Sequence, residues 1–117
     1  MSSSLNLARL RSSQEISAIR KEGQSFSSRN FVLLVKPNLL DTIRYAVIAS
    51  RRVGGAVERN RCKRRLRSRV TRLAPKITPG NDLLIIARIA CLETEPEILD
   101  KAFEQVFIQA GLISNHV

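Results

Sequence analysis

The chain has 117 residues, 44% of them hydrophobic, which is enough for one compact domain but not for two. Twenty Lys and Arg against ten Asp and Glu give a formal charge of +10, which predicts a polyanionic partner. No run approaches the roughly 20 apolar residues of a membrane helix, and the start MSSSLNLARLRSS lacks the apolar core of a signal peptide. We therefore predict one cytoplasmic domain over residues 1–117 with no membrane partner. Residues 1–10 are expected to be flexible and residues 114–117 frayed.

The first half of the chain predicts one helix and two strands. Ser12 and Glu15 have the spacing of a capping box and Gly23 is a typical helix end, so the first helix is expected between them. FVLLV, residues 31–35, and IRYAVIAS, residues 43–50, have the β-branched and aromatic composition of strands. The short connection between these two runs favours an antiparallel pair.

The middle of the chain predicts a basic helix. RRVGGAV contains two glycines that allow a sharp turn, and a helix is expected from about residue 57 to residue 73, ending before Pro75. At 100° per residue its apolar side chains fall on one stripe that can pack on a sheet. The stripe consists of Cys62, Leu66, Val70 and Leu73. Arg69 interrupts the apolar side and is expected to reach its edge. Cys62 and Cys91 are expected to be free thiols, because the chain shows no secretory signal.

The last part of the chain predicts a buried strand and an amphipathic helix. LLIIARI, residues 83–89, is apolar enough for an interior strand, with Arg88 at its exit. Thr94 and Glu97 again have capping-box spacing, with Pro96 in the first turn. The apolar positions of this helix are Ile98, Leu99, Ala102, Phe103, Val106, Phe107 and Ala110. The element order α-β-β-(β)-α-β-α predicts an α+β fold with helices packed on a small mixed central sheet of about four strands.

Half of the twenty cations fall between Arg51 and Arg72. A solvated surface helix usually mixes charges of both signs, whereas here like charges stand four residues apart, as at Arg61 and Arg65, and repel each other. A phosphate backbone would offset this repulsion, so the helix is predicted to bind nucleic acid. A strand and a glycine turn precede it in place of the second helix of a helix-turn-helix, which favours RNA over DNA.

The chain offers little support for catalysis by the protein itself. The only histidine is His116, close to the end of the chain, where a general acid or base would have no rigid position. The acids between Glu93 and Glu104 are explained by the preference of a helix N-terminus for negative charge. We therefore predict no catalytic residues and no metal site in the protein.

The stretch SRRVGGAVERNRCKRRLR resembles the signature of the bacterial ribonuclease P protein subunit. That signature has a Ser-basic-basic-x-Gly turn followed by Ala-Val, Arg-Asn-Arg and a Lys-Arg pair. DLLIIAR also resembles the family, which has an Asp, an apolar run and Ala-Arg at this place. The resemblance implies an α+β sandwich with a left-handed strand-helix-strand crossover, against the general preference for right-handed crossovers.

The resemblance also implies a function. Proteins of this family bind a large catalytic RNA and assist it in removing the 5′ leader from precursor tRNA, while the RNA and its Mg2+ ions perform the chemistry. The implied partners are thus the ribonuclease P RNA subunit and precursor tRNA, the implied cofactor is Mg2+ bound mainly by the RNA, and the protein alone is expected to be monomeric. The alternative is a ribosomal or other structural RNA-binding protein without a role in cleavage.

The resemblance assigns RNA contacts to the turn and to the basic helix, at Arg51, Arg52, Arg59, Asn60, Arg61, Lys63, Arg64 and Arg67. From position alone, Asn60 could equally cap the start of the helix. The family holds the leader in a cleft, commonly with aromatic residues, where this chain has Ile16, Arg20 and Leu34. Phe31 and Tyr45 could supply ring surface there, although a strand aromatic more often belongs to the core.

Overall fold

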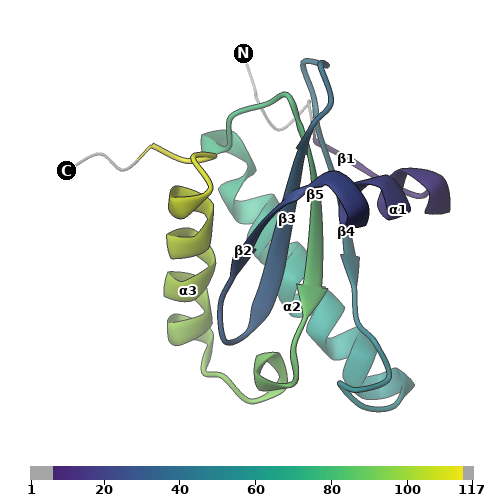
Figure 1. The fold of residues 1–117 in the computed structure, drawn as a ribbon. Coiled ribbons are helices and arrows are strands. Elements are labelled where there is room, and N and C mark those ends of the chain that lie inside the picture. Colours follow the sequence, from purple (N-terminus) through teal and green to yellow (C-terminus); the bar gives the residue numbers. More distant parts are fainter. Residues whose placement is uncertain (1–6, 115–117) are drawn as a thin grey trace.

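The computed structural model describes residues 7–114 and, over this range, forms a five-stranded mixed sheet with helices on both faces (Figure 1). In chain order the elements are β1 (Leu7–Arg9), α1 (Ser13–Glu22), β2 (Gln24–Ser27), β3 (Phe31–Pro37), β4 (Ile43–Ile48), α2 (Ala56–Leu73), η2 (Ala74–Lys76), β5 (Asn81–Ala87), η3 (Ile89–Leu92) and α3 (Pro96–Gln109). The predicted α+β class is confirmed, with one strand more than the expected four.

The strands lie in the order β1-β4-β5-β3-β2. The predicted pairing of β3 with β4 is wrong, because β5 lies between them, antiparallel to β3 and parallel to β4. The physical reason lies in composition: the run Leu83–Ile86 is apolar on both sides of the strand, and such a strand gains most from a central position with both faces covered.

The connection from β4 through α2 to β5 is a left-handed crossover, as the family resemblance implies. In Figure 1, β4 and β5 run in the same direction, β5 lies to the left of β4, and α2 passes behind the sheet. Most connections of this kind are right-handed. The crossover places the whole length of α2 across one face of the sheet, while α1 covers part of the other face.

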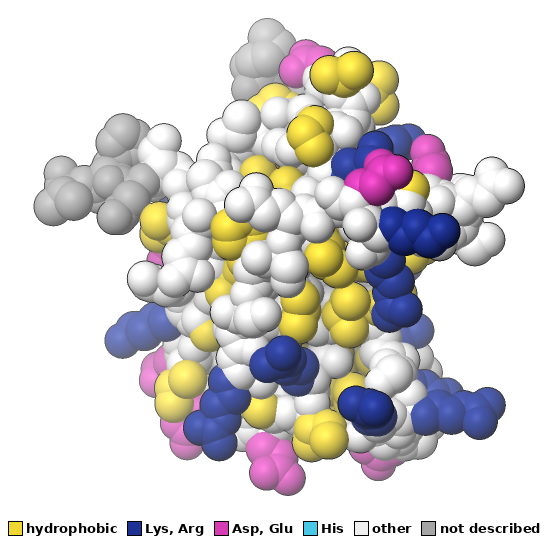
Figure 2. Space-filling view, viewed as in Figure 1, with side chains coloured by type: hydrophobic (Ala, Val, Ile, Leu, Met, Phe, Trp, Pro, Cys, Tyr) yellow, Lys and Arg dark blue, Asp and Glu magenta, His cyan; other side chains and the backbone are white. Residues whose placement is uncertain are grey.

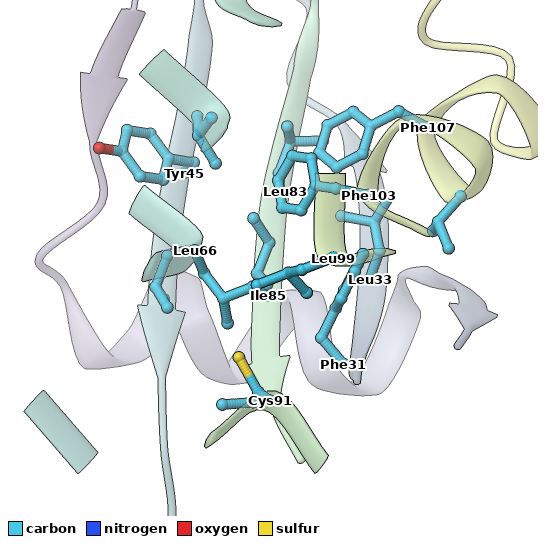
Figure 3. Packing of buried hydrophobic residues seen from close by; sticks show 14 of the residues in the cluster. Phe31, Leu33, Tyr45, Leu66, Leu83, Ile85, Cys91, Leu99, Phe103 and Phe107 are labelled. Carbon is cyan, nitrogen blue, oxygen red and sulfur yellow. The ribbon is translucent and has the colours of Figure 1, made fainter. Parts of the chain in front are cut away.

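The main core lies between the sheet, α2 and α3 (Figure 3). Cys62, Leu66 and Val70 are fully buried there, which confirms the predicted stripe of α2. The strand residues that meet them are Phe31, Leu33, Tyr45, Val47, Leu83 and Ile85. Phe31 and Tyr45 are therefore core residues on the α2 face. A second, smaller cluster on the opposite face joins α1 to the sheet through Leu10, Ile19, Leu34, Ala46 and Leu84.

Residues 7–10 form part of the sheet, where the sequence predicted a flexible segment. Leu7–Arg9 forms β1, which pairs in parallel with β4, and Leu10 is buried and donates its N–H to Tyr45 O at 2.7 Å. The expected flexibility is thus wrong for residues 7–10, because β1 satisfies the outer edge of β4. Residues 1–6 and 115–117, which include part of the predicted flexible and frayed ends, lie outside the described residues.

The start of α3 also differs from the prediction. The helix begins at Pro96 after Glu95, and the hydroxyl of Thr94 instead lies 2.6 Å from Asn30 Oδ1 and 2.7 Å from Ala90 O. Ile98, expected in the core, is 57% exposed, whereas Leu99 is fully buried. Pro96 therefore sets the helix start, and this start turns Leu99 and Phe103 toward the sheet.

Three arginines of α2 join it to the segment around α3. Arg65 donates to the carbonyl oxygens of Cys91, Leu92 and Thr94. The side chain of Arg69 is only 8% exposed, and its Nε lies 2.7 Å from Asp100 Oδ1 in an ion pair whose angle is poor for a hydrogen bond. Arg69 also donates from Nη1 to Arg65 O. Arg72 contacts the same carboxylate at 3.2 Å. Arg69 is thus buried and ion-paired, and its predicted place at the edge of the apolar side is corrected.

Replacing Leu99 by Ala should lower the free energy of unfolding by about 2–5 kcal/mol, because it leaves a cavity in the main core. The adjacent Ile98→Ala removes an exposed side chain and should change it by no more than about 0.5 kcal/mol. Urea denaturation of both variants measures the difference. Equal costs would contradict the assignment of Leu99 to the core and Ile98 to the surface.

Arg69→Ala should lower the free energy of unfolding by about 1–3 kcal/mol, because it removes a buried ion pair and leaves carbonyl groups without a donor. Arg61→Ala is the matched control on the same helix: Arg61 is exposed, and its loss should cost less than about 0.5 kcal/mol. Thermal and urea unfolding at moderate salt test both variants. A stable Arg69→Ala variant would show that this arginine does not join α2 to α3.

Candidate nucleic-acid interface

The turn before α2 depends on glycine at position 54. Gly54 has φ +147°, and a Cβ there would lie 2.8 Å from the Cβ of Glu58. Gly55 caps the helix, and its N–H donates to Glu58 Oε1 at 3.0 Å. The close turn brings Arg51 and Arg52 next to the first turn of α2, so that the cations of the loop and of the helix form one group.

The cations that the resemblance assigned to RNA lie away from the core. Arg51, Arg52, Arg61 and Arg64 are exposed, while Arg59, Lys63 and Arg67 are partly exposed. Within residues 7–114, none of these seven forms an ion pair; Arg59 donates to Gly54 O at 3.1 Å. Asn60 is exposed and lies beyond the first turn, so the capping alternative for this residue is wrong. We call this group the α2 cation face.

Arg67 borders the α2 cation face at the sheet edge. Burial, and then the nearby Arg9 of β1, lower its pKa, while Tyr45 opposes this shift. Its Nε is buried and has no hydrogen-bond partner among the described residues. An arginine in this state remains charged but lacks a full set of acceptors, which favours a further acceptor from outside the chain. Sequence reasoning missed Arg9, because it fell within the segment expected to be flexible.

The sheet face opposite α2 is only partly covered. Leu34, Leu84 and Ala46 form one row across three strands and lie beneath α1. The next row, Val32, Ile86 and Ile48, remains partly exposed. Figure 2 shows hydrophobic side chains at the surface of this face, with Lys and Arg around them. An apolar floor with cations nearby can receive bases and phosphates of a single strand.

A hollow of about 310 Å³ lies at the open end of this face, next to the turn before α2. Its lining residues are Val32, Ser50, Arg52, Val53, Ile86, Ala87, Arg88 and Ile89. Arg88 donates to Ser28 O at 3.0 Å, which holds its guanidinium near the rim. We call this site the sheet hollow. Through Arg52 it is continuous with the α2 cation face.

The three predicted cleft residues lie beside the sheet hollow and do not line it. Leu34 is buried under α1, Ile16 packs against the same cluster, and Arg20 is exposed one turn further along the helix. The structure thus brings Ile16 and Leu34 together. The lining residues Val32 and Ile86 were missed, although their alternation with Leu33 and Ile85 is a signal of two sheet faces.

The described residues contain no cluster of three or more His, Cys, Asp or Glu side chains placed to hold a metal ion. None of their helices is both long and apolar enough to cross a membrane. Cys62 and Cys91 are buried free thiols, and burial, together with the adjacent Cys62, raises the pKa of Cys91 to about 12. Both thiols therefore belong to the packing of α2 on η3.

The sequence also matches a known protein family. Residues 6–111 match the family model described as Ribonuclease P. The ribonuclease P protein component of Chloroflexus aurantiacus is 40% identical over 98 residues, which cover 84% of this chain and 68% of that protein. That of Bacillus cereus is 34% identical over 109 residues, covering 89% and 91%.

Solved structures show the same fold. The RNase P protein of Staphylococcus aureus superposes with a TM-score of 0.81 at 26% identity, covering 91% of this chain and 97% of that one. The RNase P protein of Thermotoga maritima gives a TM-score of 0.78 at 27% identity, covering 86% and 96%. With a family match across nearly the whole chain, the same fold and the signature on α2, this chain belongs to the ribonuclease P protein family.

Proposed function

We propose that the α2 cation face binds the catalytic RNA of ribonuclease P and that the sheet hollow receives the 5′ leader of precursor tRNA. As a member of its family, the chain serves as the protein component that assists the catalytic RNA in 5′ processing of precursor tRNA. The observation that carries the proposal is the division of α2 into two sides. Arg65, Arg69 and Arg72 are bonded to the segment around α3, whereas among the described residues only Arg59 of the other side has a side-chain partner, Gly54 O of the preceding turn.

The cations of the α2 cation face suit an RNA backbone. Arginine presents a planar fork that binds a phosphate through two hydrogen bonds, and all but one of the assigned cations are arginines. Each contact to a phosphate also releases counterions from the RNA, so affinity grows with the number of free cations. We assign this role to Arg51, Arg52, Arg59, Arg61, Lys63, Arg64 and Arg67, with Asn60 as a hydrogen-bonding neighbour.

The sheet hollow suits a single strand that lacks base pairs. Its floor of Val32 and Ile86 offers apolar surface to bases, while Arg52 and Arg88 at its side suit phosphates. Among residues 7–114 no aromatic side chain lines it, so these residues do not supply the roughly 1–3 kcal/mol that stacking contributes per base. Leader binding here should therefore depend on charge and on contacts with branched aliphatic side chains, with Ile16, Arg20 and Leu34 at the α1 side.

The catalytic step is assigned to the RNA and to Mg2+ ions that its phosphates hold. The protein contributes positive charge beside those phosphates and positions the substrate. We further propose that it acts in the cytoplasm, since two buried free thiols fit a reducing compartment. Outside the ribonucleoprotein it is proposed to be a monomer, because a net charge of +10 opposes self-association.

Adding the purified chain to a bacterial ribonuclease P RNA should stimulate cleavage of precursor tRNA at low Mg2+, where the RNA alone is slow. The physical reason is that protein cations replace part of the charge neutralisation that Mg2+ would otherwise provide. The control reactions contain the RNA alone and the protein alone. RNA binding without stimulation would instead favour a ribosomal or other structural RNA-binding protein, and cleavage by the protein alone would contradict the absence of catalytic residues.

The double variant Arg61→Ala/Arg64→Ala should bind the RNA subunit more weakly and with a smaller salt dependence. The log-log slope should fall by roughly 0.7–0.9 for each phosphate that the variant no longer binds. The matched control is Lys76→Ala/Lys101→Ala, which removes the same charge at exposed positions outside the α2 cation face. Fluorescence titration over a range of salt concentrations measures both. An equal weakening in the two variants would mean that only net charge matters.

A further inference from the structure

A bridge of charged side chains holds the first turn of α1 to the sheet. Arg44 of β4 donates to both carboxylate oxygens of Asp82, from Nε at 2.8 Å and from Nη2 at 2.7 Å. Its remaining nitrogen, Nη1, donates to Glu15 Oε2 of α1 at 2.9 Å. Glu15 thus reaches the sheet instead of completing the capping box that its spacing predicted, although its N–H still donates to Ser12 Oγ at 3.3 Å.

The sheet side of this bridge is rigid. The side chain of Asp82 is only 6% exposed, and Asn38 Nδ2 donates to its Oδ1 at 2.9 Å. The hydrogen bonds to Asp82, and further the one to Glu15, raise the pKa of Arg44 against the effect of burial. Arg44 therefore presents a fixed charge, held in a planar fork by Asp82, to a carboxylate of α1 that is itself partly exposed.

The bridge lies at the end of the sheet face away from the sheet hollow. Lys36, Asp82 and Arg44 form one row across the strands, the row beneath α1 follows, and Val32, Ile86 and Ile48 form the uncovered row beyond it. Successive rows on one face are about 6.6 Å apart. A swing of the first turn of α1 by about one row along the strands would bring it over Ile48, at the β4 side of the floor of the sheet hollow.

The chain is fixed to the sheet on both sides of α1, because Leu10 N–H donates to Tyr45 O before the helix and Gln24 pairs with Val35 directly after it. Within these limits, few contacts oppose a swing of the first turn. Ile19 is the fully buried residue of α1, and Ile16 is partly buried beside it. Apolar contacts are not directional, so they tolerate small shifts of a helix over a flat aliphatic row. The pair of Lys36 with Glu22, near the other end of α1, is long at 3.9 Å and largely exposed. The directional restraint on the first turn is thus the contact of Glu15 with Arg44.

We propose that Glu15 is a positioning residue for the leader of precursor tRNA. Acting through Arg44, it holds the first turn of α1 at the Asp82 end of the face and so keeps the β4 side of the sheet hollow open to the leader. This inference rests on the proposed function of the sheet hollow. It assigns to Glu15 an effect on leader binding, and none on the chemical step or on the contact between α2 and the RNA subunit.

The test compares Glu15→Gln with Glu22→Gln in the reconstituted holoenzyme. Both substitutions remove one carboxylate from α1 and change the net charge equally, but only Glu15 contacts Arg44. Each holoenzyme is assayed on a precursor tRNA with a leader of several nucleotides and on one with a single-nucleotide leader. Glu15→Gln should raise KM for the long leader roughly threefold, the size expected for a half-exposed ion pair, with kcat unchanged. The single-nucleotide substrate and the Glu22→Gln holoenzyme should show no such rise.

Three other results would overturn the inference. A rise of KM that is the same for both leaders would assign Glu15 a general structural role, and equal behaviour of Glu15→Gln and Glu22→Gln would reduce it to a surface charge. Glu15→Lys, which places a positive charge beside Arg44, should raise KM for the long leader more than Glu15→Gln does. A smaller rise would also contradict the inference. If the unmodified protein itself does not distinguish the two leaders, the proposed function of the sheet hollow fails first. Urea unfolding of each variant confirms that the compared proteins are folded.

Discussion

The docking of α2 on the sheet through a single apolar stripe is the contact on which the rest of the molecule depends. Cys62, Leu66 and Val70 are fully buried, and a buried aliphatic side chain of this size contributes about 1.5–3 kcal/mol. The stripe fixes the rotation of the helix about its axis. Arg64 then lies roughly 160° from the middle of the stripe and must face outward. The same packing thus holds the helix and directs its cations to solvent.

Elements with strong local signals were predicted well, and their pairing was not. The bounds of α2, its stripe and the central character of β5 follow from helical periodicity and from a continuous apolar run. β1 and β2 are short, and the QSFS sequence of β2 is largely polar, so neither has a strong strand signal of its own. They form strands because β1 pairs with the open edge of β4 and β2 with that of β3. The position of β5 between β3 and β4 depends on contacts distant in sequence, and the left-handed crossover followed from family resemblance alone.

The sequence predicted that the cations gather on α2, but not which of them bind inside the protein and which face solvent. Arg65, Arg69 and Arg72 follow the spacing i, i+4, i+7, which places them on one side of α2 and could have been read from the sequence. Their partners on that side are Asp100 and nearby carbonyl groups. A sequence does not show which acid will lie opposite. For the same reason the sequence did not predict the ion pair of Glu15 with Arg44. The spacing of Ser12 and Glu15 indicated a capping box, and the side chain of Glu15 contacts Arg44 instead.

The two sides of α2 respond differently to the repulsion among its cations. On the inner side, Asp100 and the carbonyl groups after β5 offset the charge, and these contacts are partly buried and weakly screened by salt. On the outer side no acidic side chain among the described residues pairs with the cations, and dissolved ions screen their repulsion. Phosphates of an RNA strand would replace those ions. Under the proposed contact, the cost of this repulsion to the free protein would fall when RNA binds. Binding would then couple the stability of α2 to assembly of the ribonucleoprotein.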